Sequence, residues 1–386
     1  QTKTMPHEVT RTDSAPVKYK RDEKTGYYKP AVDQKAGKQK SWNLTRLSSR
    51  ENPLVIFTLA AQAAAGAFAL LFFGKLFNSA VLMPVIASPI SSLIVVKTLA
   101  LIALGLLMST IHLGKPMRFY RGFNNLRHSP VAREGLGIVL FMVFAGIHFL
   151  AALPNNAWVQ QSIGVLHADW QNFANIIANS TAGLAVLSSI VALYYMYRCY
   201  RIKARPFWNH YQTAFTFVGN ALILGSIVIG VLAVPYLLWI NASATSLLSL
   251  LGSVMAAGML LEAIGLYWHA HDMHEAEHEG AASFYIQLTT FGKTYFTRNL
   301  LLGINTSAAL LLAVFGSDSA LSLSLWAVLL ASTVMVSLVG RSLFYVLVVP
   351  TTMPGAFFWK NKAFEQHARD IGLADLPQVG VAPLRH

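Results

Sequence analysis

Eight apolar runs, each long enough to cross a lipid bilayer as an α-helix, constrain this chain more than any other feature. The runs cover residues 53–74, 91–111, 135–153, 173–196, 214–238, 244–267, 299–316 and 322–349. They are continuous rather than alternating, and irregular backbone cannot face lipid, so a barrel is excluded. The predicted fold is therefore an all-α integral membrane protein with an eight-transmembrane-helix bundle over residues 53–349.

The composition rules out the two or three soluble domains that 386 residues would otherwise suggest. Hydrophobic residues make up 54% of the chain and charged residues only 12%, with a mean hydropathy of +0.48. The 30 Lys and Arg residues dominate a formal net charge of +13. Because the apolar runs exclude them, these basic residues must concentrate in a few extramembrane segments.

The distribution of these basic residues predicts the orientation of the bundle. An even number of spans places both termini on one side, and the extramembrane segments of that side carry 27 of the 30 Lys and Arg residues. Those segments are residues 1–52, 112–134, 197–213, 268–298 and 350–386. The loops of the other side carry Lys75 alone. The positive-inside rule then predicts a multi-pass protein of the bacterial inner membrane with cytoplasmic termini.

The two ends of the chain are polar cytoplasmic extensions. Residues 1–52 contain no apolar core of a cleavable signal peptide and too few aliphatic residues to fold alone. We interpret them as a basic, extended segment that docks on a partner, although a tail attracted to anionic lipid head groups is the alternative. Residues 350–386 form a similar C-terminal tail. Aromatic residues that could act as docking anchors are Tyr19, Tyr27, Tyr28 and Trp42.

The chain offers few ligands for metals. Its single cysteine, Cys199, excludes an internal disulfide and any iron–sulfur cluster or Cys-based zinc site built by this chain alone. Only His148 lies well inside a span, so no bis-histidine haem is expected. His271, His274 and His278 share a helical face, but a solvated helix end that faces a partner explains this run better than a metal site does.

Two ionisable residues lie at one depth near the basic side. His112 closes the second span, and Glu134 lies in the second turn of the third, after Ser129 as N-cap and Pro130. A quinol releases two protons with its two electrons, so its site needs a base such as imidazole and a carboxylate that relays the proton. The alternative is that both residues only stabilise helix ends.

The segment between these two residues mixes cationic and aromatic side chains. Such a mixture suits a flat aromatic ligand with polar ends. The residues are Lys115, Arg118, Phe119, Tyr120, Arg121 and Phe123.

Arg341 lies inside the last span, with Tyr345 one turn later on the same face. A guanidinium at that depth must face the bundle interior and find a partner. We expect an ion pair with Glu262 in the sixth span, either as part of a site or as a structural lock. Lys97 lies near a helix end and can extend its amine to the interface.

Four stretches together resemble the anchor subunit family of dimethyl sulfoxide reductase. They are residues 52–66 around Gln62, the motif Ser-Thr-Ile-His-Leu-Gly-Lys-Pro over 109–116, residues 129–134, and Gly-Arg-Ser-Leu-Phe-Tyr over 340–345. The resemblance implies that His112 is the quinol-site residue and that Glu134 is the acidic residue 22 positions later. With these two residues, Gln62, Arg118, Arg341 and Tyr345 are the expected quinone-binding residues.

The resemblance also implies the partners of this protein. Anchors of this family carry no cofactor of their own and bind an iron–sulfur subunit with four 4Fe-4S clusters and a catalytic subunit with molybdenum bis-pterin guanine dinucleotide. The protein would bind menaquinone or ubiquinone, show no activity alone, and serve sulfoxide or N-oxide reduction or sulfite oxidation by the catalytic partner. No nucleic acid is expected as a partner. A small-solute transporter and a purely structural anchor are the alternatives.

Overall fold

The computed structural model describes residues 8–10, 17–21, 28–32, 41–47, 51–111, 113, 115–165, 167–276 and 279–347. Eight of the helices in this part of the chain are long and apolar enough to cross a membrane, which confirms the predicted all-α bundle. They are α2 (Asn52–Leu76), α4 (Ile90–Ile111), α5 (Pro130–Ala152), α7 (Ala168–Tyr200), α8 (Gln212–Trp239), α9 (Thr245–Glu275), α11 (Gly292–Phe315) and α12 (Ala320–Val346). The predicted tail over 350–386 lies outside the described residues.

The segment over 268–298, which the sequence predicts to lie outside the membrane, is helical for much of its length. Helix α9 continues to Glu275, α10 (Glu279–Leu288) follows, and α11 begins at Gly292. The added turn of α11 carries Arg298, which is only 4% exposed. Apolar content alone could not locate these helix ends, because a polar turn remains helical wherever tertiary packing accommodates its side chains.

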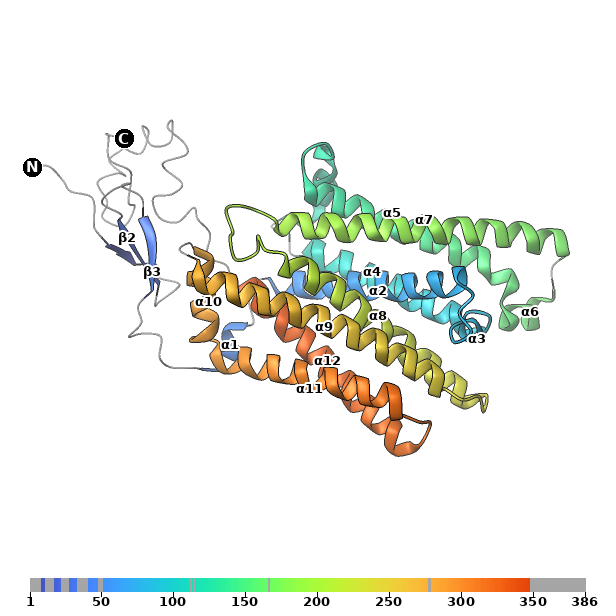
Figure 1. Cartoon of the computed structure of the whole chain (residues 1–386). Helices are drawn as coiled ribbons and strands as arrows, with labels where there is room; N and C mark the ends of the chain where they lie inside the picture. Colours follow the sequence, from blue (N-terminus) through green and yellow to red (C-terminus); the bar gives the residue numbers. More distant parts are fainter. Residues whose placement is uncertain are drawn as a thin grey trace, which may run out of the picture.

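Helix α2 is the centre of the bundle. It contacts α4, α7, α8 and α12. Figure 1 shows α5 and α7 along one side of the molecule and α11 and α12 along the other, with α2, α4 and α8 between them. Side chains on α2 are therefore surrounded by protein, and this position suits a polar residue such as Gln62, which is fully buried.

Small residues allow α2 and α8 to approach closely. A Cβ atom added to Gly66 would lie 1.8 Å from the carbonyl oxygen of Ala221, and one added to Gly225 would lie 2.4 Å from the carbonyl carbon of Gly66. In lipid, helices associate through such close backbone packing because burial of apolar surface gives little advantage there. Gln62 lies one turn before Gly66 on α2. The close crossing of α2 and α8 therefore holds the Gln62 side chain inside the bundle.

The N-terminal region adds a small antiparallel sheet in the order β1 (Glu8–Thr10), β2 (Val17–Arg21) and β3 (Tyr28–Val32), and β3 contacts α10. Residues 41–47, which include α1 (Leu44–Leu47), are tied to the turn between α10 and α11. There the Ser41 hydroxyl and the Asn43 amide both donate to the Thr290 carbonyl oxygen, at 2.6 and 2.9 Å. Part of the N-terminal segment therefore docks on the bundle itself.

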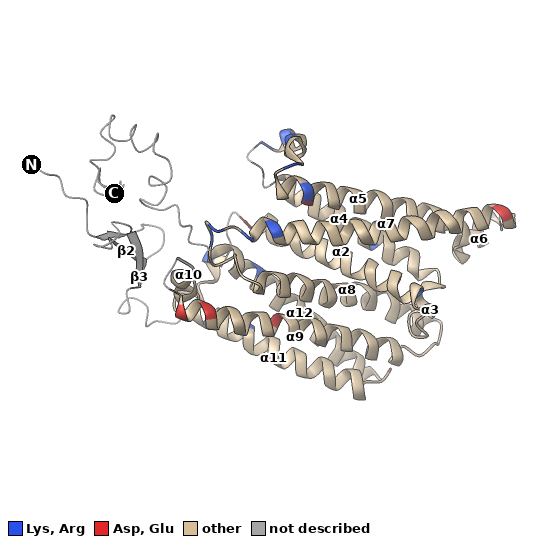
Figure 2. Cartoon of the chain, turned by 45° about the horizontal axis from the view of Figure 1, so that its top comes forward, with Lys and Arg blue, Asp and Glu red and all other residues tan. Residues whose placement is uncertain are grey.

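Basic residues gather at one end of the bundle. Figure 2 shows most Lys and Arg residues of the described part of the chain at the end where α10 lies, which we call the basic end. It includes η1 (Pro116–Asn125) and the loop between α7 and α8. The opposite end carries the short helices α3 (Met83–Ile86), η2 (Leu153–Asn155) and α6 (Ala157–Ile163).

Candidate functional site

A cluster of buried polar side chains lies toward the basic end, where α2, α5, α7 and α12 meet. We call it the polar cluster. All of its members except the half-buried Cys199 are at most 9% exposed. The members are Thr58, Gln62, Glu134, Cys199, Tyr200, Arg341 and Tyr345.

Glu134 is placed by the predicted start of α5. Ser129 caps this helix by accepting a hydrogen bond from the amide of Ala132 at 3.3 Å, and Pro130 begins it. Glu134 is 6% exposed, and its Oε2 accepts a hydrogen bond from the Cys199 thiol at 3.1 Å. Its Oε1 has no hydrogen-bond partner among the described residues. A buried carboxylate oxygen without a partner is costly, which makes it a candidate acceptor for a ligand proton.

Two tyrosines connect α7 to α12 beside this carboxylate. The Tyr200 and Tyr345 hydroxyls form a hydrogen bond with each other, and Tyr345 also bonds to the Thr58 hydroxyl on α2. Both phenols interact electrostatically with Glu134 and with Arg341. The pair is therefore close to both the buried anion and the buried cation.

Arg341 is held by α2 and by aromatic rings. Its Nη2 donates to Gln62 Oε1 at 3.0 Å, and its Cζ lies 4.2 Å from the ring centroid of Phe217 on α8. A guanidinium over an aromatic face is stabilised by the ring quadrupole. Trp208 stacks on Phe344 and donates to the Phe344 carbonyl oxygen at 2.7 Å, which closes the cluster toward the loop between α7 and α8.

The expected ion pair between Arg341 and Glu262 is wrong. Glu262 pairs instead with Arg298 of α11, and both side chains are at most 4% exposed. Gly340 makes room for this pair, because a Cβ atom there would lie 2.6 Å from Arg298 Nη2. The sequence does not indicate this pairing, because Arg298 directly precedes the apolar run over 299–316 and falls in the predicted extramembrane segment over 268–298.

A small cavity lies beside both arginines. Arg298, Arg341, His269 and Gln287 line it, and its volume is about 30 Å³, which is room for one water molecule. Nε and Nη1 of Arg341 and Nε of Arg298 have no hydrogen-bond partner among the described residues. This cavity is too small for an aromatic ring.

The segment before α5 is fastened to the bundle by Arg133, which sequence reasoning did not single out. Its guanidinium donates to the carbonyl oxygens of Leu126 and Arg127 and to the Tyr195 hydroxyl. Phe123 of η1 packs over Gly135, at 3.4 Å from where a Cβ atom would be. The loop that follows α4 is thus held close to the start of α5, where Glu134 lies.

The structure brings four of the six predicted site residues together. Gln62, Glu134, Arg341 and Tyr345 belong to the polar cluster. Arg118 lies apart from them, exposed in η1 with non-helical backbone angles. His112 lies outside the described residues, between the end of α4 at Ile111 and η1.

Sequence reasoning missed Cys199 and Tyr200 as members of the cluster. Neutral residues near a helix end give no signal comparable to a charge inside an apolar run. Their position could be recognised only from the packing of α7 against α5 and α12.

The histidine-rich end of α9 is used for local contacts in the structure. His269 bonds to the Phe207 carbonyl oxygen at 3.1 Å, and His210 bonds to Asp272 at 2.9 Å. His271 and His274 are exposed, and His278 lies outside the described residues. In the part of the sequence that the structure describes, no three His, Cys, Asp or Glu side chains converge to hold a metal ion.

Comparison with known proteins agrees with this architecture. The family described as "DMSO reductase anchor subunit (DmsC)" matches residues 47–347. The sequence is 28% identical over 225 residues to the C chain of anaerobic dimethyl sulfoxide reductase from Haemophilus influenzae, a match that spans 58% of this protein and 71% of that relative. It is 22% identical over 161 residues to the YnfH chain of anaerobic dimethyl sulfoxide reductase from Escherichia coli, spanning 42% of this protein and 51% of that relative. Because the family match includes all eight long helices, the chain belongs to the DMSO reductase anchor subunit family.

Proposed function

We propose that this chain is the quinone-reactive membrane subunit of a heterotrimeric molybdenum oxidoreductase. The observation that carries the proposal is Glu134, a buried carboxylate near the basic end with one oxygen lacking a partner among the described residues. Ionisable groups within membrane spans are expensive to bury and usually serve a function. A quinol hydroxyl would supply the hydrogen bond that Oε1 lacks, and then a proton.

The ring of the quinol binds where the loop after α4 meets the start of α5. Phe123 over Gly135 offers an apolar wall there, and the exposed Arg118 and Tyr120 lie on the same η1 segment. The cavity that the described residues form beside Arg341 has a volume of about 30 Å³, which is too small for the ring. The ring therefore approaches Glu134 from the loop side, where His112 lies in the sequence.

The chemistry is proton transfer coupled to electron transfer. A quinol that becomes a quinone gives up two electrons and two protons. The protons pass to His112 and Glu134, which act as bases, and the electrons pass to the nearest cluster of an iron–sulfur partner. The reverse direction, reduction of a quinone, uses the same groups as acids.

Arg341, Gln62 and Tyr345 act as positioning residues beneath this site. Two arginines and two glutamates are buried in this part of the bundle, so their formal charges cancel when both carboxylates are ionised. A proton on Glu134 leaves one positive charge in excess. Arg341 therefore favours onward release of that proton from Glu134. The tyrosine pair fixes the distance between the Arg341 guanidinium and the Glu134 carboxylate.

Membership of the family supports the partners that we propose. Both relatives are chains of anaerobic dimethyl sulfoxide reductases, and an anchor subunit implies further subunits. We assign to this protein an iron–sulfur subunit with four 4Fe-4S clusters and a molybdopterin catalytic subunit, which bind at the basic end. That end faces the cytoplasm of a bacterial inner membrane. The catalytic partner determines the substrate, by sulfoxide or N-oxide reduction or by sulfite oxidation.

Replacement of Glu134 by Gln tests the proton role, because Gln keeps the shape and can still accept from Cys199. We expect quinol-linked turnover of the whole complex to fall by about 10²- to 10⁴-fold. Reduction of the catalytic partner by an artificial dye should be unchanged. His112→Ala should behave in the same way, whereas Glu275→Gln, at an exposed position on α9, should have no effect. Unchanged quinol turnover in either of the first two variants contradicts the proposal.

Purification from native membranes in mild detergent tests the partners. We expect two large polypeptides to accompany the protein, together with molybdenum, iron and extractable menaquinone or ubiquinone. A protein that is recovered alone and free of metal would instead favour a small-solute transporter. Two partners without any quinone would favour a purely structural anchor.

A further inference from the structure

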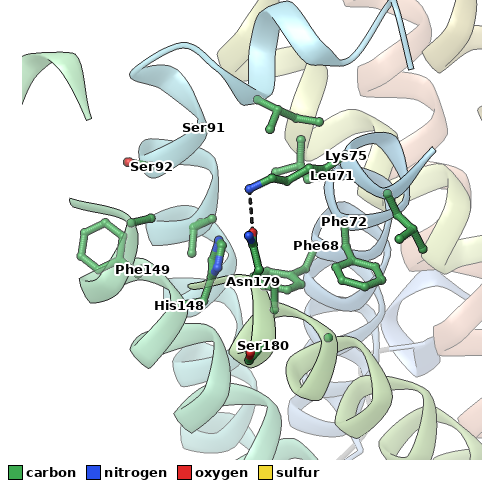
Figure 3. Close-up of a pocket in the computed structure, with 16 residues that line it drawn as sticks. Phe68, Leu71, Phe72, Lys75, Ser91, Ser92, His148, Phe149, Asn179 and Ser180 are labelled. Atoms are coloured by element: carbon green, nitrogen blue, oxygen red, sulfur yellow. Dashed lines mark hydrogen bonds between the residues drawn. The ribbon is translucent and has the colours of Figure 1, made fainter. Parts of the chain in front are cut away.

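A large cavity lies at the opposite end of the bundle, away from the polar cluster. It is formed by the outer turns of α2, α4 and α5 and by α7, and its volume is about 580 Å³. This volume lies in the range of small-molecule sites. Figure 3 shows its lining side chains, which project into a common space from these four helices.

The walls of this cavity are apolar and partly aromatic. Phe68, Phe72 and Phe149 contribute rings from α2 and α5. Phe68 meets the imidazole of His148 edge to face, with centroids 5.4 Å apart. Such walls favour a flat hydrophobic ring over a hydrated ion.

His148 lines the cavity, and its hydrogen bond defines the tautomer of the imidazole. Its Nδ1 lies 2.8 Å from the carbonyl oxygen of Ala178. A carbonyl oxygen only accepts hydrogen bonds, so Nδ1 carries the proton. The neutral ring then has its acceptor at Nε2, and a ligand beside it must offer an O–H or N–H donor.

Lys75 supplies the complementary group. Its ammonium donates to Asn179 Oδ1 at 2.8 Å, and Figure 3 shows this pair among the side chains that line the same cavity as His148. An ammonium has three N–H donors, so it can donate further to a ligand oxygen. The cavity thus combines an acceptor, a donor and aromatic walls.

We propose that this cavity is a second binding site for a hydroquinone ring. One ring hydroxyl donates to His148 Nε2 and the other accepts from Lys75, while the ring packs against the phenylalanines. The phosphodiester of a phospholipid fits less well, because it has only acceptors and leaves Nε2 without a partner. The proposal extends and rests on the proposed function, since it assigns to this protein a second site for the same class of ligand.

This site is separate from the reaction site at the basic end. His148 lies 14 residues after Glu134 on α5, which corresponds to about 21 Å along the helix axis. The buried residues of α5 between them carry no polar side chain, namely Gly137, Ile138, Phe141 and Ala145. The second site therefore holds the quinol without oxidising it.

Binding stoichiometry of the purified complex tests the proposal. The probe is the fluorescent hydroquinone analogue 2-heptyl-4-hydroxyquinoline N-oxide, titrated into the complex in nanodiscs of phosphatidylcholine. We expect two molecules per anchor subunit in the native protein. His148→Leu should weaken one of them about tenfold, because it removes the acceptor, whereas His148→Gln should largely restore binding. Quinol-linked turnover should be unchanged in both variants.

Control variants distinguish the two sites. His167→Leu, at an exposed histidine of the same end, should leave both molecules bound. Gly183→Leu fills the cavity, since a Cβ there meets only Phe72 at 3.9 Å, and should remove the same molecule as His148→Leu. Glu134→Gln should weaken only the other molecule. If this variant leaves both molecules bound as in the native protein, the result counts against the proposed function and not against this inference. A single bound molecule that is insensitive to both cavity variants, or displacement of the second by phosphatidylglycerol, overturns the inference.

Discussion

At the scale of single residues, buried charge is the dominant feature of this protein. Glu134, Glu262, Arg298 and Arg341 are each at most 6% exposed in a bundle whose surroundings are lipid and apolar side chains. The sequence could identify three of them, because charges inside apolar runs are rare. It could not identify their partners, since Arg341 bonds to Gln62 and Glu262 bonds to Arg298. The partner of a buried charge depends on how the helices are rotated.

Glu262→Gln should destabilise the protein strongly, because it leaves the Arg298 guanidinium without a counter-charge. Loss of one partner of a buried ion pair costs about 3–5 kcal/mol in free energy of unfolding. Thermal unfolding of the purified protein in detergent, followed by tryptophan fluorescence, should show a clearly lower midpoint. The double variant Glu262→Leu with Arg298→Leu should recover most of the loss. An unchanged midpoint in Glu262→Gln would show that the pair does not stabilise the fold.

At the scale of helices, close backbone crossings determine which side chains meet. The crossing of α2 and α8 at Gly66 and Ala221 brings Gln62 toward the bundle interior, where Arg341 of α12 reaches it. Likewise, Gly137 of α5 packs directly on Ala192 of α7, with a hypothetical Cβ 2.9 Å from its Cα. The helix pair α5 and α7 carries Glu134 at its basic end and His148 at its opposite end. The positions of the side chains in the polar cluster and in the large cavity therefore depend on helix contacts that lie a turn or more away from them.

Gly66→Ala should force α2 and α8 apart, because the added methyl group would meet the Ala221 carbonyl at 1.8 Å. We expect a lower unfolding midpoint and weaker quinol-linked turnover. Gly303→Ala on α11 is the matched control, since nothing lies within 4 Å of a Cβ at that position. That change should be neutral or stabilising by up to about 1 kcal/mol. Equal stability of the two variants would contradict the close crossing.

At the scale of the whole molecule, the two ends of the bundle differ in charge and in the ligands they suit. The basic end carries most of the Lys and Arg residues of the described part of the chain (Figure 2). At the opposite end, Lys75 lines the large cavity. The difference in charge arises from the composition of the loops and does not depend on how the helices pack inside the bundle. It predicts which end faces the cytoplasm and receives the soluble partners.

Thiol labelling of membrane vesicles tests this orientation. In a Cys199→Ser background, Lys203→Cys places a thiol in the exposed loop between α7 and α8, and Ala80→Cys places one at the opposite end. An impermeant maleimide should label position 203 only in inverted vesicles and position 80 only in right-side-out vesicles. The reverse pattern would place the basic end outside the cytoplasm.

The sequence by itself determined the eight spans, the start of α5 at Ser129 and Pro130, and the family motifs. These features depend on local composition, because lipid selects each helix by its own length and apolarity. Only the tertiary structure decided which polar groups meet, and Arg341 and Gln62 are 279 residues apart in the sequence. The large cavity likewise joins Lys75 and His148 from two helices. Such contacts depend on helix rotation and crossing, which small residues control at a few points and which no single span encodes.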